Sequence, residues 1–388
     1  MNRNYHQSVY LNTIFLLLIF IFTAATVLRP QKERSETENR SLQKRPELNW
    51  DSLISGEFSR KYEDYLSDQF ILRDGWITLR TGAERLILKQ EINDVCFAGD
   101  DYLIEKHTGS FTSDTASQNI ARISDFMNQA AGKLGEDHVT CMLVPNAVDV
   151  LRDKLPAFAD PYDEECYLEQ VRDALPDGVW MDASSVLKEQ YEKDPTDQGQ
   201  LYYRTDHHWT TFAAHLVFEQ WRRQKAIGGE TPDDYNVTEV TDSFEGTIAA
   251  KLGIRGRADA IERYDPVSPF DYYLVYNQSD DIRNSVYQEN CLDTRDKYAY
   301  FYGGNYGLVE AKMPDSDTGR RLLIIKDSYA HCFAPFTYAY FDEVDMVDPR
   351  YYNASIQQLI SEKSYTDVLF LFNAAGFAEE TALARLLL

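Results

Sequence analysis

The stretch RRLLIIKDSYAHCF, residues 320–333, decides the fold. Its apolar run, residues 322–325, is typical of a strand that is buried on both faces. The polar residues that follow predict a turn at the carboxyl end of that strand, with Ser328 in the turn. Because ligands of α/β proteins bind at this edge of the sheet, a serine there can present its hydroxyl and backbone N–H to a ligand. The simpler interpretation is that Ser328 only caps the next helix.

Apolar strands and amphipathic helices alternate on both sides of this stretch. Further buried strands are expected at residues 138–145, 178–183, 342–348 and 366–373, and helices at residues 117–134, 184–193, 212–221 and 354–363. A hairpin is expected at residues 94–105, with its turn at 99–101, and a β-rich insertion at about 231–300, where Asp, Tyr and Gly recur without a helical period. The alternation predicts an α/β sandwich around a mostly parallel sheet.

The amino-terminal part has a different character. Residues 9–28, VYLNTIFLLLIFIFTAATVL, are apolar and long enough to cross a bilayer as a helix. We expect a signal-anchor over residues 1–29 that holds an extracytoplasmic body at the cell membrane, although basic residues on both flanks do not favour export by themselves. The alternative is a cleaved signal peptide. A polar tether and helical arm are expected over residues 30–90, and the main domain over 91–388.

Charge and cysteine content exclude some classes of protein. The 388 residues carry a net charge of -24, from 63 acidic and 39 basic residues, so the field of the protein repels phosphate backbones and nucleic acid is excluded as a partner. With 44% hydrophobic residues the chain can bury a large core. Its five cysteines are scattered without a CxxC pair, which favours isolated thiols over a metal clip.

A second chemical motif is YYRTDHHWTT, residues 202–211, just before an expected helix. Asp206 and His208 lie two positions apart, so in an extended loop both point the same way. The carboxylate can then accept a hydrogen bond from the imidazole and fix its tautomer. In that geometry His207 points away and packs or makes a structural hydrogen bond. We therefore expect His208, and not His207, to be a catalytic base.

Four motifs taken together resemble a known family: TDHHWT, LLIIKDSYA, GGNYG at residues 303–307 and ENRSLQKRPEL at residues 38–48. They resemble the DHHW protein family, which is similar to the alginate O-acetyltransferases of the SGNH hydrolase superfamily. The resemblance covers about residues 37–372. It implies an SGNH-like three-layer α/β/α sandwich. It also implies that Ser328 is the nucleophile, His208 the base and Asp206 the acid of a catalytic triad.

The resemblance implies an O-acyltransferase, most simply an O-acetyltransferase, that modifies hydroxyls of a cell-surface or exported polysaccharide. Ser328 would form an acyl-enzyme that a sugar hydroxyl resolves. The backbone N–H of Gly304 and the side-chain amide of Asn305 would help the Ser328 N–H to bind the oxyanion. A turn is the competing interpretation of the GGN sequence. No cofactor and no metal are implied, and a membrane-embedded acyltransferase is the implied acyl supplier.

Three alternatives remain open at this stage. Water can replace the sugar hydroxyl, which would make the protein a carbohydrate esterase with the same triad. The aromatic residues can instead line a groove of a non-catalytic glycan-binding or envelope scaffold protein. A zinc site is conceivable from the residues Asp206, His207, His208, His215 and His331. Adjacent histidines seldom converge on one ion, and the sequence has no HExxH pair.

Overall fold

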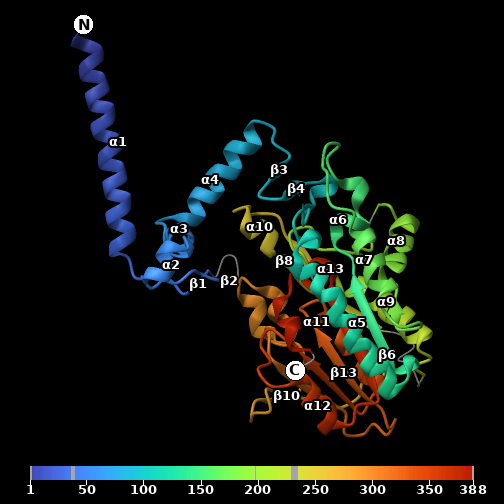
Figure 1. The fold of residues 1–388 in the computed structure, drawn as a ribbon. Helices are drawn as coiled ribbons and strands as arrows, with labels where there is room; N and C mark the ends of the chain where they lie inside the picture. Colours follow the sequence, from blue (N-terminus) through green and yellow to red (C-terminus); the bar gives the residue numbers. More distant parts are fainter. Residues whose placement is uncertain (1, 36–39, 197, 229–234, 387–388) are drawn as a thin grey trace. The chain divides into compact units, whose positions relative to one another are not determined.

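The computed structural model describes residues 2–35, 40–196, 198–228 and 235–386. The chain forms two compact units. The first comprises residues 1–89 and 250–254, and the second comprises residues 90–249 and 255–388. Figure 1 gives the order of the elements along the chain. Parts of the expected tether, residues 36–39, and of the expected insertion, residues 231–234, lie outside the described residues.

The first unit is helical. Its longest helix is α1, Asn2–Leu28, and the segment Ser8–Leu28 is long and apolar enough to cross a membrane, by length and composition. The polar stretch after α1 contains two-residue strands, β1 (Arg34–Ser35) and β2 (Arg40–Ser41), which pair with each other. Three further helices follow: α2 (Trp50–Ile54), α3 (Glu57–Gln69) and α4 (Arg73–Leu86).

The second unit is built on an eight-stranded sheet with the order β11-β10-β12-β14-β13-β15-β6-β7. Its strands are β6 (Val139–Val144), β7 (Trp180–Met181), β10 (Tyr273–Tyr276), β11 (Ile282–Arg283), β12 (Leu308–Lys312), β13 (Arg321–Lys326), β14 (Glu343–Val347) and β15 (Asp367–Asn373). The five strands β14, β13, β15, β6 and β7 are parallel, and the other three are antiparallel. The expectation of an α/β fold with a mostly parallel sheet is confirmed.

Helices cover both faces of this sheet. Successive residues of a strand point to opposite faces, so a strand in which every residue is apolar has two apolar faces to bury. In β13, Leu322 and Ile324 belong to one apolar core, and Leu323 and Ile325 to the other. Among the described residues, four helices contribute to the first core: α6 (Ala147–Val150), α8 (Ala183–Lys193), α9 (Thr211–Gln224) and α11 (Ala330–Phe333). Four contribute to the second: α5 (Asp114–Leu134), α7 (Glu164–Asp173), α12 (Ile356–Lys363) and α13 (Ala374–Glu379).

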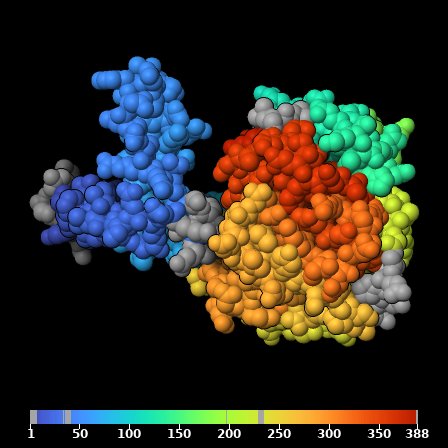
Figure 2. Space-filling model, turned by 90° about the horizontal axis from the view of Figure 1, so that it is seen from below, coloured from blue at the N-terminus to red at the C-terminus, as the bar shows by residue number. Residues whose placement is uncertain are grey.

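The smaller β elements lie beside this sheet. Strands β4 (Val95–Phe97) and β5 (Leu103–Glu105) form the expected hairpin, and β3 (Glu91–Ile92) pairs with β4. In the expected insertion, β8 (Tyr235–Phe244) pairs with β9 (Asp259–Pro266) as a separate ribbon. Strands β10 and β11 instead extend the central sheet through β12. Figure 2 shows this region, yellow to orange, merging into the same surface as the red carboxyl-terminal part.

Candidate active site

Three side chains from distant parts of the sequence form one chain of hydrogen bonds. The Nδ1 atom of His208 lies 2.5 Å from Oδ1 of Asp206, and its Nε2 atom lies 2.8 Å from Oγ of Ser328. An ionised carboxylate only accepts hydrogen bonds, so Nδ1 carries the proton and Nε2 accepts from the serine hydroxyl. The structure therefore brings together Asp206, His208 and Ser328 in the order that a serine nucleophile, its base and an orienting acid require.

The loop that carries Asp206 and His208 is a bend between two anchors. Tyr202 and Trp209 form an isolated antiparallel bridge, and the side chain of Thr210 caps α9 by accepting from Ala213 N. The indole N–H of the buried Trp209 donates to the carbonyl of Tyr329, 2.9 Å away. Trp209 thus holds the base-bearing loop directly against the turn that follows the nucleophile.

Asp206 is buried and fully bonded. Its Oδ2 accepts from the backbone N–H and hydroxyl of Thr247, at 2.7 and 2.8 Å, and Oδ1 also accepts from the backbone N–H of His208. Burial by itself would raise the pKa of Asp206, but the neighbouring imidazoles and these donors hold it well below its usual range. A Cβ on Gly246 would lie 2.3 Å from the Asp206 Cβ, so this close approach requires glycine.

His208 is held in its neutral form. Burial, followed by the neighbouring His207, lowers the pKa of His208 to about 4, although Asp206 acts in the opposite direction. The imidazole is therefore neutral at pH 7. One face of its ring stacks on Tyr298, and the hydroxyl of Tyr298 donates to the Ser328 carbonyl at 3.3 Å.

His207 departs from the expectation that it points away. Its ring centroid lies 4.0 Å from that of His208, and it lines the same cavity as Ser328. The reason is that residues 204–208 form a bend and not an extended segment, so side chains do not alternate there. The expected structural hydrogen bond is present, because His207 Nδ1 lies 2.8 Å from Oγ1 of Thr247. The backbone N–H of His208 donates to the Asp206 carboxylate, and this hydrogen bond closes a turn that brings the two side chains together.

Ser328 follows β13 in a turn that Asp327 shapes. The buried Asp327 accepts from the backbone N–H of Tyr329 through Oδ1, and from the backbone and side-chain N–H groups of Asn373 through Oδ2. The turn leads into α11. The end of the neighbouring parallel strand β15 thus helps to fix the turn that contains Ser328, at the carboxyl edge of the sheet.

A cavity of about 220 Å³ opens in front of Ser328. Its walls combine acidic, basic and amide groups: Glu105, His107, Asn146, His207, Asp327, Arg350, Asn373, Glu379 and Glu380. Asn146 and Asn373 follow β6 and end β15, and the Asn146 side chain donates to that of Asn373 at 3.1 Å. Sequence reasoning placed both strands but missed these residues. Parallel strands have their carboxyl ends at the same edge of a sheet, so polar residues that follow the predicted strands could have been identified as candidates.

Gly304 and Asn305 are not brought to this cavity. Neither residue is part of its wall, and Asn305 is exposed. Gly304 has a φ of 124°, which glycine adopts readily, so the segment forms a turn. Their assignment to an oxyanion site therefore has no support in the geometry of the described residues.

Arg350 is the other residue that sequence reasoning missed. Its Nε and Nη2 atoms donate to the two carboxylate oxygens of the buried Asp348, at 2.8 and 2.7 Å. Asp348 also lies 3.4 Å from Nζ of Lys326, which in turn lies 2.8 Å from Nε2 of His331. This buried network holds a guanidinium at the wall of the cavity that contains Ser328. Nothing in the local sequence distinguishes Arg350 from a surface arginine.

Two clusters have metal-ligand chemistry among the described residues. In the first, Asp206, His207 and His208, both ring nitrogens of His208 already contact Asp206 and Ser328. In the second, Glu310, Glu343 and Asp345, the ammonium of Lys363 contacts all three carboxylates and occupies the place of a cation. His215 and His331, the remaining residues of the conceivable zinc site, do not belong to either cluster.

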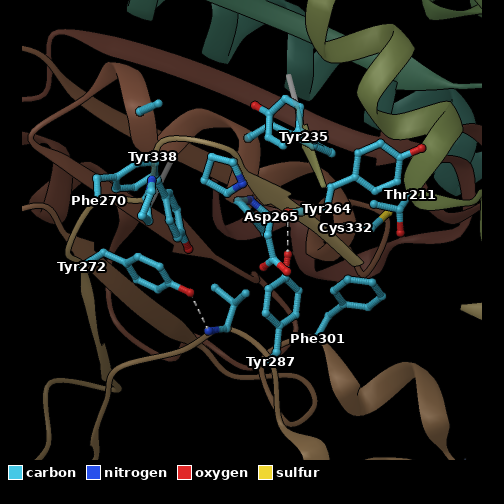
Figure 3. Close-up of a pocket in the computed structure, with 16 residues that line it drawn as sticks. Thr211, Tyr235, Tyr264, Asp265, Phe270, Tyr272, Tyr287, Phe301, Cys332 and Tyr338 are labelled. Atoms are coloured by element: carbon cyan, nitrogen blue, oxygen red, sulfur yellow. Dashed lines mark hydrogen bonds between the residues drawn. The ribbon is translucent and has the colours of Figure 1, made fainter. Parts of the chain in front are cut away.

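A second cavity of about 280 Å³ is lined mainly by aromatic rings (Figure 3). In it, the hydroxyl of Tyr287 donates to the Tyr264 carbonyl, and the backbone N–H of Val286 donates to the hydroxyl of Tyr272. Asp206, His208 and Ser328 do not line it, but Cys332 does, and the thiol of Cys332 lies 3.5 Å from the hydroxyl of Tyr298. Tyr298 therefore separates this aromatic cavity from the base.

The fold and the site define a mixed α/β protein with a Ser-His-Asp constellation at the carboxyl edge of a largely parallel sheet. The model of the DHHW protein family matches residues 98–347, and the chain belongs to this family. No curated protein sequence matches the chain closely enough to count as a relative.

Solved structures share the fold at low sequence identity. A DHHW family protein from Eubacterium siraeum aligns with a TM-score of 0.57 and 20% identity, over 75% of this chain and 94% of its own. Bacillus cereus PatB1, in a structure with a sulfonyl adduct, aligns with a TM-score of 0.59 and 18% identity, over 76% and 99%. The O-acetyltransferase domain of Pseudomonas putida AlgJ aligns more loosely, with a TM-score of 0.45 and 12% identity, over 74% and 92%.

Proposed function

We propose that this protein is an SGNH-type serine O-acyltransferase, most simply an O-acetyltransferase, that modifies hydroxyl groups of a cell-surface or exported polysaccharide. The observation that carries the proposal is the hydrogen-bond chain from Asp206 through His208 to Ser328. In this proposal α1 anchors the chain and the second unit works outside the cytoplasm. Residues 30–90 are the arm between anchor and catalytic domain, and a membrane-embedded acyltransferase supplies the acyl group.

The reaction proceeds in two balanced steps. Ser328 Oγ attacks the carbonyl carbon of the acyl donor while its proton passes to His208 Nε2. The tetrahedral intermediate then expels the leaving group, which takes that proton, and the acyl group remains as an ester on Ser328. In the second step an acceptor hydroxyl gives its proton to Nε2 and attacks the ester carbon, and Oγ leaves and recovers the proton. Asp206 stays ionised and stabilises the imidazolium.

The oxyanion of each intermediate needs hydrogen-bond donors. The backbone N–H of Ser328 has no acceptor among the described residues and is the first donor that we propose. Asn146 is the second donor that we propose, because its side-chain amide lines the cavity that contains Ser328. These two groups replace Gly304 and Asn305 in the proposed mechanism.

The acceptor is proposed to be a glycan. The aromatic cavity does not include Asp206, His208 or Ser328, so in this proposal it binds a part of the glycan away from the reacting hydroxyl. Eight of its wall residues are aromatic: Tyr235, Tyr264, Phe270, Tyr272, Tyr287, Phe301, Phe336 and Tyr338. Tyrosine combines an apolar ring with a polar hydroxyl, which suits a ligand that has both apolar faces and hydroxyl groups. Transfer to such a ligand outcompetes hydrolysis only if the acceptor hydroxyl is held near the ester.

The proposal is tested with the full-length chain in detergent or vesicles. An aryl sulfonyl fluoride should add one sulfonyl group to Ser328, as detected by mass spectrometry, since PatB1 has been obtained with a sulfonyl adduct. The enzyme should hydrolyse a small acetyl ester slowly and transfer acetyl to oligosaccharides faster. Release of acetate alone, across many acceptors, would identify an esterase. An inert and unlabelled Ser328 in a folded chain would identify a scaffold protein.

A further inference from the structure

The junction between α3 and α4 packs directly on the apolar helix α1, within the first unit. The ring of Phe22 lies 6.1 Å from that of Phe70 and 5.7 Å from that of Trp76, measured between centroids. The backbone N–H of Ile71 donates to Oγ1 of Thr26 at 3.4 Å. One side of the apolar helix, at Phe22 and Thr26, is therefore in contact with this junction, whereas Val27 and Leu28 remain 72% and 83% exposed.

The position of Phe22 along α1 indicates how deep the rings of Phe70 and Trp76 would lie in a bilayer that α1 spans. It precedes the end of the apolar segment, Leu28, by six residues, which corresponds to about 9 Å along a helix. If the segment Ser8–Leu28 spans a bilayer, the rings of Phe70 and Trp76 must then lie beside its hydrocarbon boundary. Interfacial helices insert their apolar faces to a depth of roughly 5–10 Å, which matches this position.

The rest of α4 has the surface of such a helix. Leu79 and Leu86 are 62% and 85% exposed, and they lie three and ten residues after Trp76, on the same side of the helix. Ile87 and Leu88, directly after the helix, are 77% and 84% exposed. Large apolar side chains that gather at one exposed face mark an interaction surface and not an ordinary solvated face.

The charge of the arm differs from that of the main body. Residues 30–90 contain 11 Lys/Arg and 11 Asp/Glu, whereas residues 91–388 contain 26 Lys/Arg and 52 Asp/Glu. A bacterial or other anionic membrane surface repels the body but not the arm. A polar cavity of about 630 Å³ lies at the end of α1, at the level expected for lipid headgroups. Its wall contains three basic residues, Arg29, Lys32 and Arg73, and three acidic residues, Glu33, Asp68 and Asp74.

We propose that the α3–α4 junction and the apolar face of α4 lie in the membrane interface, against the same lipid bilayer that α1 crosses. This inference rests on the proposed anchoring by α1 and adds a second membrane contact to it. Its consequence is that the first unit has two contacts with the bilayer, one through α1 and one through α4.

The test uses the fluorescence of Trp76 in the full-length chain reconstituted into vesicles of phosphatidylcholine and phosphatidylglycerol with brominated acyl chains. Bromines near the headgroup end of the acyl chain should quench part of the tryptophan emission. That quenched part should disappear in Trp76→Phe and persist in Trp180→Phe, which alters a tryptophan of the second unit. Leu79→Glu should reduce the quenching, whereas Val267→Glu, at an exposed position of the second unit, should not.

Failure of the anchor and failure of this inference give different results. A chain that an alkaline carbonate wash removes from the vesicles has no membrane span, and the proposed anchoring is then wrong. A chain that resists the wash while Trp76→Phe retains the full quenched signal has its anchor, but α4 does not contact lipid. That outcome overturns the inference and favours a protein partner for the apolar face.

Discussion

The imidazole of His208 stacks on the ring of Tyr298, with centroids 3.8 Å apart and ring planes 14° apart. Tyr298 is buried, and its hydroxyl also donates to the carbonyl of Ser328 at 3.3 Å. One side chain thus contacts both the proposed base and the turn of the proposed nucleophile. The Tyr298 hydroxyl bonds to the Ser328 carbonyl and not to the Ser328 Oγ or to a ring nitrogen of His208. Tyr298 is therefore a positioning residue.

We expect Tyr298→Phe to lower kcat/KM by less than about tenfold, because the ring stack remains and only one hydrogen bond is lost. Tyr298→Ala should lower it about 100-fold, since a base displaced by about 1 Å loses its alignment. Ester hydrolysis kinetics measure both effects. Circular dichroism and thermal unfolding separate them from loss of the fold. Equal losses in the two variants would show that the hydroxyl, and not the stack, matters.

Replacing His208 by Gln should lower kcat by about 10³-fold or more, because no other described side chain accepts the Ser328 proton. The matched variant His207→Gln should keep substantial activity, although its ring borders the cavity. Single-turnover acylation with a chromogenic acetyl ester measures the step directly. A larger loss in His207→Gln than in His208→Gln would reverse the assignment of the base.

The pH profile should reflect the lowered pKa of His208. The base acts only when neutral, and burial together with His207 lowers its pKa to about 4. The acid limb of kcat/KM should thus lie near pH 4 and not near the ordinary histidine pKa of about 6.5, with activity falling as the pH decreases through that value. Brief assays after pH jumps, with fluorescence as a control for unfolding, measure this. An acid limb near pH 6.5 would contradict the buried geometry.

Arg350 should affect the binding of the acceptor or the acyl donor more than the chemical step at the triad. Its guanidinium lies in the cavity wall and is oriented by Asp348. Arg350→Ala should therefore raise KM for acetyl transfer to an anionic oligosaccharide by about tenfold, the loss expected for one charge-assisted hydrogen bond. Arg350→Lys should recover part of it, and Arg257→Ala serves as an exposed control. An unchanged KM with a collapsed kcat for small esters would instead place Arg350 at the oxyanion.

Lys363 should be a main determinant of stability at neutral pH. Its ammonium contacts Glu310, Glu343 and Asp345, and burial raises the pKa of Asp345 to about 6. Lys363→Met removes the cation that Glu310 and Asp345 contact, while Glu343 keeps Lys312 and Arg321 at 4.0 Å, and should lower the free energy of unfolding by about 3 kcal/mol at pH 7. The deficit should shrink towards pH 5, as the carboxylates bind protons. Urea unfolding at both pH values measures it. A deficit that does not depend on pH would indicate lost packing alone.

The sequence by itself determined the local features of this protein. The apolar run before Ser328 predicted β13, the alternation of strands and helices predicted a largely parallel sheet, and the run at residues 9–28 predicted the apolar helix α1. These features depend on residues close together in the sequence, because hydrophobic periodicity is a property of a single helix or strand. The motif around Asp206 and His208 was also visible locally, although a bend and not an extended loop brings them together.

The distant groups that surround Ser328 are brought together only by the tertiary fold. His208 and Ser328 are 120 positions apart, and Asn146, Tyr298, Arg350 and Asn373 reach the same place from four other segments. Such convergence depends on strand order and packing, for which a single sequence carries no local signal. The same reason explains why Gly304 and Asn305, close to Ser328 in sequence, lie elsewhere: the chain forms β12 and returns along β13 before it reaches the catalytic turn.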